Sequence, residues 1–410
     1  MNYWRRQIVI SSVILVALGG SLNAERVNTV NASVNLVASA DDNPQLDTAG
    51  AVPTPPRGDF FFTYGIYPSI TLNSTGPHSN LRLSYSFGFN RVDSQENIET
   101  RSHNFGGEVD AQLTSNLQLR LEESFIRTSD LITFNLLRGV LITPEGVFFD
   151  SETIPLNQDY YQNRVSVGLD YSLNPNSSFS FGLGHSLRRY QENLPSATNL
   201  SDQDGLTADL GYTHTMDPRS SWNLAYSVSL YDFQEFESAR THLVPVGFSH
   251  QFSPTVSLSL GTGPSYTEAT DRQSGYFSLK NGSLTLSKSL EDNLLSFSYL
   301  QRSGTSTGAG SVSDAKTLRL NFTRPIGRRT SVSANVTLYD TEGRLDNPVD
   351  NRGFSTSLVF NFLLYNRWFL VVGGSYQDQK ESRQGTEIFE TKRTRVFVSL
   401  RFTLPELLRF

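Results

Sequence analysis

The chain has 410 residues, of which 37% are hydrophobic and 18% are charged, and it contains no cysteine. With a mean hydropathy of −0.32, it has too few apolar residues to fill the several cores that a soluble chain of this length normally contains. The lack of cysteine excludes disulfide frameworks, thiolate metal sites and cysteine nucleophiles. A formal net charge of −6 gives no electrostatic footprint for nucleic acid.

Residues 1–24 have the pattern of a secretory signal peptide. Arg5 and Arg6 form a basic start, residues 8–18 are apolar, and Ala24 ends a cleavage site. The arginine pair leaves twin-arginine export as an alternative, although its flanking residues fit that signal poorly. We therefore predict an exported mature chain, 25–410, in which no later apolar run is long enough for a transmembrane helix.

Throughout the mature chain, apolar and polar side chains alternate with a period of two. Near the C-terminus, for example, Val396, Val398 and Leu400 fall on one face of a strand, while Arg395 and Arg401 fall on the other. This period indicates strands whose two faces meet different environments. No helical segment is available to cover either face. The pattern therefore predicts one large, closed antiparallel sheet with lipid outside and polar groups inside.

Two kinds of connection alternate along the chain. Short joins rich in Asn, Asp, Pro, Gly and Ser, which favour tight reversals, lie at 73–77, 114–116, 174–177, 216–219, 253–255, 290–293, 325–328 and 365–367. Longer polar connections lie at about 41–58, 94–100, 131–158, 192–203, 235–238, 269–274, 304–312, 342–352 and 381–390. Together they join about eighteen strands, so the prediction is a single-domain, all-β, transmembrane antiparallel up-and-down β-barrel.

The alternative folds are a soluble β-sandwich, a propeller or a tandem array of exported domains. Sandwich strands are usually about 5–6 residues long, whereas most of these are about twice that, and no repeat typical of propeller blades is present. In a bacterial barrel, an even number of strands and short turns on one rim place both termini in the periplasm. Trp222, Trp368 and Tyr365 beside short turns fit an interfacial aromatic belt, or the general enrichment of aromatic residues in strands.

The N-terminal part of the mature chain carries a family resemblance. A strand at 31–39 is followed by Ala-Asp-Asp-Asn-Pro at 40–44, a Pro-rich loop, Gly-Asp-Phe at 58–60 and Tyr-Pro-Ser-Ile-Thr-Leu at 67–72. This order resembles outer-membrane β-barrel porins associated with exopolysaccharide systems, including barrels that accompany the exosortase sorting machinery. The resemblance implies a Gram-negative outer membrane and a role in polymer secretion, and it supplies no catalytic residues.

The C-terminus departs from what such barrels usually show, which is a final aromatic residue read by the barrel-insertion machinery. The last strand is expected to end at Phe402, because Pro405 cannot donate to a strand ladder. Either Phe402 or Phe410 is therefore a candidate for the recognised residue.

Motifs for catalysis and metal binding are weak. The six histidines form no metal-binding pair, and His185 and Ser186 are immediate neighbours that a strand points to opposite faces. The histidines are therefore expected to be polar groups of the rim or lumen, and the chain is not expected to be an enzyme or to bind a cofactor or metal. Residues 41–43 (Asp-Asp-Asn) suggest calcium, but they lack the spacing of a calcium loop, so a solvated loop is the better reading. Glu122 and Glu123 resemble a catalytic pair but should face apart.

Transport is the better use of the predicted polar face. Charged side chains lining a lumen tune solute selectivity, or they cross-brace the wall of a wide barrel. The predicted lumen-lining residues are Arg82, Glu108, Asp110, Arg120, Glu122, Arg164, Asp170, Arg188, Asp209, Arg319, Arg395 and Arg401. Their mixed signs select no solute charge.

The connection at 131–158 is unusually apolar and includes Phe134, Phe148 and Phe149, with Glu145 in a Pro-Glu-Gly segment. So much apolar surface is unsuited to water, so the loop is predicted to fold inward and constrict the channel. A partner-docking tip or a strand extension above the membrane remain alternatives.

Taken together, the sequence predicts an outer-membrane porin that passes polar solutes or polysaccharide by passive diffusion. The alternative is a non-conducting structural or assembly barrel of an exopolysaccharide secretion system. The expected partners are outer-membrane lipid, the insertion machinery and possible polysaccharide export components, with the oligomeric state left open.

Overall fold

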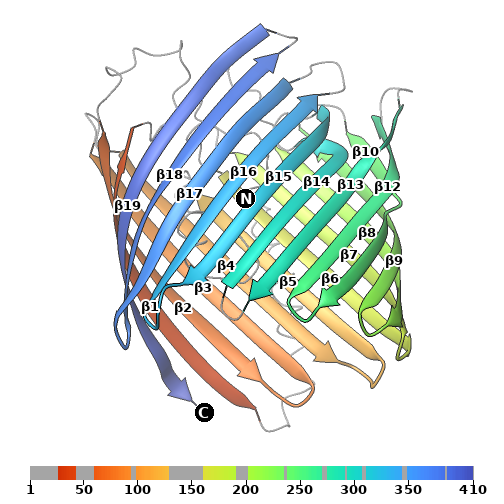
Figure 1. Cartoon of the computed structure of the whole chain (residues 1–410), viewed down its shortest axis with the longest axis horizontal. Coiled ribbons are helices and arrows are strands. Elements are labelled where there is room, and N and C mark those ends of the chain that lie inside the picture. The colour runs from red at the N-terminus through yellow and green to blue at the C-terminus, as the bar shows by residue number, and fades with distance from the viewer. Residues whose placement is uncertain are drawn as a thin grey trace, which may run out of the picture.

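The computed structural model describes residues 26–42, 60–93, 98–128, 160–190, 202–234, 238–269, 275–290, 293–306, 311–343, 349–383 and 386–409. Every element in these residues is a β-strand, and the strands form one antiparallel sheet. The first strand pairs with the second on one side and with the last on the other. The sheet is therefore closed, without a free edge, and its tilted strands wrap into the barrel of Figure 1.

The strands follow one another in chain order around the wall. Their bounds are β1 (Val27–Asp41), β2 (Phe61–Thr75), β3 (Ser79–Asp93), β4 (Ile98–Gln112), β5 (Leu117–Thr128), β6 (Tyr160–Asn174), β7 (Ser177–Tyr190), β8 (Gln203–Asp217), β9 (Ser220–Phe233), β10 (Ala239–Leu243), β11 (Val246–Ser253), β12 (Val256–Ala269), β13 (Gly275–Leu290), β14 (Asn293–Ser306), β15 (Ser311–Pro325), β16 (Thr330–Gly343), β17 (Val349–Tyr365), β18 (Trp368–Arg383) and β19 (Thr386–Arg409).

β10 and β11 are two halves of one strand, because both pair with β9 and with β12. Counted in this way, the described residues make the predicted eighteen-stranded barrel, which is confirmed. The interruption at Val244 and Pro245 was not predicted. Pro245 has no N–H to donate, but the backbone N–H of Ala225 still donates to its carbonyl at 2.9 Å.

A glycine makes this interruption possible. Val244 donates its N–H to the Pro264 carbonyl of β12 at 3.0 Å, which brings the two strands close together beside Gly263. A Cβ at Gly263 would lie 2.1 Å from the Val244 carbonyl oxygen. Only glycine fits so close an approach of two backbones.

The short connections lie on one rim of the barrel, as predicted. The described turn at 326–329 needs a left-handed backbone at Gly327, where φ is +82°, a conformation that glycine adopts without strain. Both ends of the described chain lie at this rim, because Thr29 pairs with Asn73 beside the first turn and with Arg409 near the C-terminus. We call it the short-turn rim.

At the opposite rim, β16 to β19 are longer than predicted. The connections expected at 342–352 and 381–390 are largely strand, since β16 reaches Gly343, β17 begins at Val349 and β19 begins at Thr386. Outward-facing charges explain the difference, because opposite charges on neighbouring strands can pair in water.

Those charges form two groups of ion pairs, one across β15, β16 and β17 and one between β18 and β19. Lys316 Nζ lies 3.4 Å from Asp340 Oδ2, and Arg352 Nε lies 3.0 Å from Asp340 Oδ1. Lys380 Nζ lies 3.3 Å from Glu390 Oε1. The polar residues at 342–352 and 381–390 predicted loops, but most of them belong to strand ends that extend past the apolar part of the outer face.

The last strand also corrects a prediction. β19 does not end at Phe402 but runs to Arg409, and Thr403 and Leu408 pair with Ser33 and Val30 of β1. The pairing shifts register between Val30 and Ala32, so the segment around Pro405 is irregular. Pro405 is tolerated because β18 begins opposite Phe402, and the tail pairs on one side only.

The two faces of the wall differ in the way the alternation predicts. On β19, Val396 and Val398 are 52% and 44% exposed, while Phe397 and Ser399 between them are 2% and 1% exposed. Nothing in the described chain packs against the outside of β19, so the buried set faces inward. Within the described residues, no helix is long and apolar enough to cross a membrane.

Candidate functional site: the inner wall

Directly paired residues of neighbouring strands lie on the same face of a sheet, so the inner face can be followed from strand to strand. Starting from Ser399 and Phe397, the cross-strand pairs lead around the whole barrel. The second half follows in the same way. All twelve predicted charged residues fall on this inner face.

Six of the twelve lie together near the short-turn rim of β3 to β6, and we call this group the charged patch. It consists of Arg82, Glu108, Asp110, Arg120, Glu122 and Asp170. Two arginines against four carboxylates leave the patch with two more negative than positive groups. One ion pair lies within it, because Arg120 Nε is 3.0 Å from Asp110 Oδ1.

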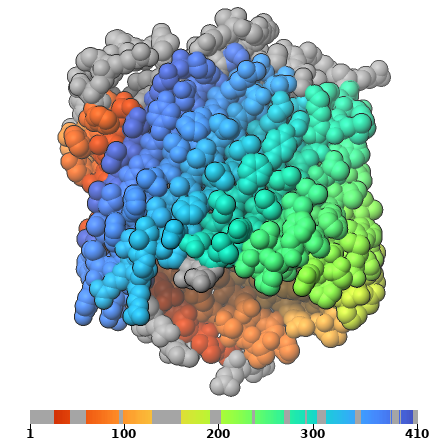
Figure 2. Space-filling view, in the orientation of Figure 1, coloured from red at the N-terminus to blue at the C-terminus, as the bar shows by residue number. Residues whose placement is uncertain are grey.

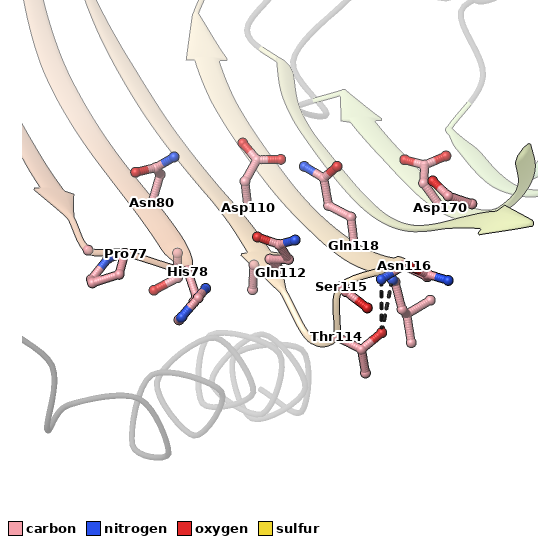
Figure 3. A pocket seen from close by; sticks show the side chains of 15 residues that line it. Pro77, His78, Asn80, Asp110, Gln112, Thr114, Ser115, Asn116, Gln118 and Asp170 are labelled. Atoms are coloured by element: carbon pink, nitrogen blue, oxygen red, sulfur yellow. Dashed lines mark hydrogen bonds between the residues drawn. The ribbon is translucent and has the colours of Figure 1, made fainter. Parts of the chain in front are cut away.

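A hollow of about 360 Å³ adjoins the charged patch at the rim. Asn80, Asp110, Gln118 and Asp170 line it and point to the same side of the sheet in Figure 3. The turn below is held by Thr114, whose Oγ1 accepts the N–H groups of residues 116 and 117 at 3.3 and 3.1 Å. A rigid turn keeps the two carboxylates at the mouth of the barrel.

The remaining predicted residues are scattered along the inner wall. Arg188 donates to Gln162 Oε1 at 3.1 Å and lies 5.7 Å from the centre of the Tyr160 ring. Asp209 is exposed on β8, opposite glycine and serine residues, and Arg164 is exposed on β6. They are not brought together with the charged patch.

Arg319 lies on β15, and Arg395 and Arg401 lie on β19, which pairs with β1. Arg395 is 2% exposed and donates to Ser39 Oγ at 3.0 Å. The Arg401 guanidinium lies 4.6 Å from the centre of the Phe369 ring. Arg395 and Arg401 therefore pack against other residues of the barrel wall and do not extend into the lumen.

Among the described residues, the inward charges that the sequence did not predict include Asp41, Arg302 and Arg393. Arg393 has the same odd-numbered alternation as Arg395, so extending that pattern two residues would have found it. Asp41 was read as part of a solvated loop, which is wrong, because it is 2% exposed at the end of β1. Its carboxylate contacts Arg393 instead of a metal, and the described residues hold no metal-binding cluster.

Between β9 and β13 the inner wall is of a different kind. No charged side chain of the described chain faces inward on these strands, and hydroxyl groups dominate. The inward hydroxyl residues include Ser227, Ser229, Thr241, Ser249, Ser257, Ser259, Ser265, Thr267, Ser278, Ser283, Thr285 and Ser287. The lumen is therefore asymmetric, with a charged patch facing a neutral, hydroxyl-rich wall.

Of the two positions predicted for the histidines, the rim and the lumen, the lumen is wrong for five of the six. Five of the six face outward by register, namely His103, His185, His214, His242 and His250. Four bond a hydroxyl of a neighbouring strand, as His103 Nδ1 does with Tyr85 at 2.9 Å and His242 Nδ1 with Tyr226 at 2.7 Å. A satisfied imidazole beside aromatic rings suits the interface of a lipid layer.

In each residue pair that resembled a catalytic group, His185–Ser186 and Glu122–Glu123, the two side chains face opposite sides of the sheet. Ser186 pairs with inward Gly205 and Arg164, while His185 pairs with outward Val165 and Leu206. Glu122 and Glu123 likewise face opposite sides. The predicted constriction loop at 131–158 and the signal peptide at 1–24 lie outside the described residues.

No protein-family model and no curated protein matches the sequence. Solved structures similar to the chain include OccAB2 of Acinetobacter baumannii (10% identity, TM-score 0.48, covering 92% of this chain and 98% of that one). OccK7 (OpdD) of Pseudomonas aeruginosa has 11% identity, a TM-score of 0.47 and coverage of 92% and 99%. The outer membrane protein opdK of the same species has 9% identity and a TM-score of 0.44, and the match covers 92% of this chain and 99% of that one.

Proposed function

We propose that this chain is an outer-membrane channel that lets polar solutes cross by passive diffusion. The observation that carries the proposal is the distribution of side chains across the barrel wall, which is the reverse of that in a soluble protein. Large apolar side chains are exposed on the outside, and polar side chains face the inside. Leu210 and Leu183 are 54% and 43% exposed on the outward face, whereas the charged side chains of Arg164 and Asp209 are exposed on the inner face. Lipid stabilises such an outer face, and water suits such an inner one.

The proposed location is the outer membrane, reached through the predicted signal peptide and the barrel-insertion machinery. The short-turn rim would face the periplasm together with both termini, as is usual for bacterial barrels. The outward ion pairs of β15 to β19 would then stand on the extracellular side, above the hydrocarbon. The aromatic contact of Trp368 with Phe402, at 4.7 Å between ring centres, fits the periplasmic interface.

The chemistry of the lumen supports neutral, hydroxyl-rich solutes as the class that passes, including polysaccharide. The neutral wall of β9 to β13 offers exchangeable hydrogen bonds without charges that would trap an ion. The twelve inward charges would line the passage, and those of the charged patch lie at its periplasmic mouth. Figure 2 shows the barrel hollowed at that rim, with the inner side of the orange strands visible beyond.

Planar-bilayer conductance of the refolded mature chain, 25–410, tests the proposal. A steady conductance that added polysaccharide blocks is the expected result. Deleting 134–149 tests the proposed constriction loop separately, since removal of a constriction by Phe134, Glu145, Phe148 and Phe149 should raise single-channel conductance. An unchanged value would remove the loop from the account.

A second function has one observation in its favour. Inward side chains on β18, β19 and β1 are buried, including Val371 at 0%, Phe397 at 2% and Val37 at 6% exposure. That side of the lumen is packed rather than wet, which suits a non-conducting barrel that acts as a structural or assembly component of exopolysaccharide secretion. A folded barrel that passes no current, yet co-purifies with polysaccharide export proteins, would favour this function.

A further inference from the structure

The outward face of β5 carries one residue that does not suit lipid. Leu121, Glu123 and Phe125 follow one another on this face. In the part of the chain that the structure describes, Glu123 is the only outward carboxylate whose two outward neighbours on its own strand are both apolar. A charged carboxyl group without a cation beside it in an apolar layer is unfavourable, so such residues usually mark a functional contact.

The strands next to Glu123 offer it no cation, and its side-chain hydrogen bond is with the neutral amide of Asn163 on β6. Its directly paired neighbours are Gly107 on β4 and Val165 on β6. Beyond Val165, the same row continues with His185 on β7. An acid and a base thus stand in one row on either side of β6, with a valine between them.

At neighbouring-strand spacings of about 4.8 Å, Glu123 and His185 are roughly 10 Å apart. That is too far for a direct pair within one chain. His185 itself is 47% exposed at its side chain, with its Nε2 atom 3.7 Å from Asp204 Oδ1. Its ring is therefore accessible from outside the barrel.

We propose that β5, β6 and β7 form a two-fold contact with a second copy of this chain. A half-turn about an axis through β6 places β5 of one copy against β7 of the other, so Glu123 meets His185 of the partner subunit twice. Such an isologous interface must be self-complementary, and an acid and a base flanking an apolar strand meet that condition. Val165, Val167 and Leu169 would pack against their own copies at the axis, in place of lipid.

The contact lies on the outward face and goes beyond the proposed channel function. It does not depend on whether the lumen conducts, because the residues concerned do not face the lumen. A failure of the cross-linking experiment below would leave the conductance experiment unaffected, and the reverse also holds.

Cross-linking through single cysteines tests the contact directly, because the natural chain has none. Val167→Cys is made in the full-length chain and treated, in outer-membrane vesicles, with a short membrane-permeant bis-maleimide. The expected result is a covalent dimer. The matched control is Val336→Cys, an outward valine on β16 that is far from the proposed axis, and it should stay monomeric.

Absence of a dimer from folded Val167→Cys, or equal dimer from Val336→Cys, would overturn the proposal. If Val167→Cys does not fold, Leu169→Cys probes the same strand. Adding Glu123→Gln to Val167→Cys should lower the dimer yield about tenfold, and His185→Gln should lower it equally, because each residue contributes to both contacts. Glu268→Gln, an outward acid on β12, is the matched control and should change nothing. An undiminished yield with Glu123→Gln would overturn the assigned pair.

Discussion

Arg393 and Asp41 join the last strand of the barrel to the first. Nε and Nη2 of Arg393 lie 2.7 and 2.5 Å from Oδ2 of Asp41, although the two residues are 352 positions apart in the chain. Their side chains are 5% and 2% exposed. The neighbouring Asp42 accepts the backbone N–H of Thr394 at 2.6 Å, so this end of the closing seam rests on two aspartates.

The buried ion pair predicts a stability effect. Asp41→Ala should lower the free energy of unfolding by about 3–5 kcal/mol, because it leaves the Arg393 guanidinium buried without its carboxylate. Equilibrium urea unfolding of the refolded barrel, followed by tryptophan fluorescence, measures the change. The matched control is Asp209→Ala on the exposed inner face of β8, which should cost less than about 0.5 kcal/mol. Equal losses of unfolding free energy in the two variants would show that the ion pair of Asp41 and Arg393 does not stabilise the barrel more than an exposed charge does.

The charged patch predicts a selectivity change, provided that the barrel conducts. Replacing Asp110 and Asp170 by Asn removes two of its four carboxylates, so the reversal potential in a KCl gradient should shift toward anion selectivity. Ser259→Asn on the neutral wall is the control and should leave the reversal potential unchanged. A shift toward cations would contradict the placement of the patch in the conducting path.

The break between β10 and β11 predicts a strict requirement for glycine. Gly263→Ala places a Cβ against the Val244 carbonyl, so it should cost about 1–3 kcal/mol of unfolding free energy or more. Gly282→Ala is the matched control, since its Cβ would lie 3.7 Å from the nearest atom, the Gly261 carbonyl oxygen. Urea unfolding of the two variants should separate them clearly, and equal midpoints would argue against the close approach.

The apolar outer face predicts a depth-dependent cost of charge. Val336→Arg, midway along the outward face of β16, should cost about 2–4 kcal/mol, whereas an arginine near the interface costs about 0–1 kcal/mol. Ser382→Arg, on the outward extension of β18, is the matched comparison at the far rim. Folding into lipid vesicles, measured by urea titration, reports both values. A soluble barrel would show similar small effects at the two sites.

Much of the fold was predictable because the alternation of side chains is local. The period of two assigns Val396 to one face and Arg395 to the other without knowledge of any partner strand. Short Asn, Pro and Gly clusters mark the reversals in the same local way. The same reasoning placed all twelve charged residues on one face and separated Glu122 from Glu123.

What the sequence did not reveal depends on pairing between distant segments. The polar ends of β16 to β19 are strand rather than loop because charges on neighbouring strands pair, as Lys316 does with Asp340. Pro405 stays within β19 because β18 ends its pairing at Phe402. The strand ends of β16 to β19 and the position of Pro405 both depend on residues of neighbouring strands, which the local sequence pattern does not identify.

The sequence by itself determined the fold class of the molecule, an antiparallel barrel with an apolar outside and a polar inside, because strand period and turn chemistry are encoded residue by residue. Only the tertiary structure decided which side chains meet. It placed Asp41 beside Arg393 at the seam, and Glu123 and His185 in one row across β6. Register is set by the pairing of whole strands, so neighbours across the wall cannot be read from either strand alone.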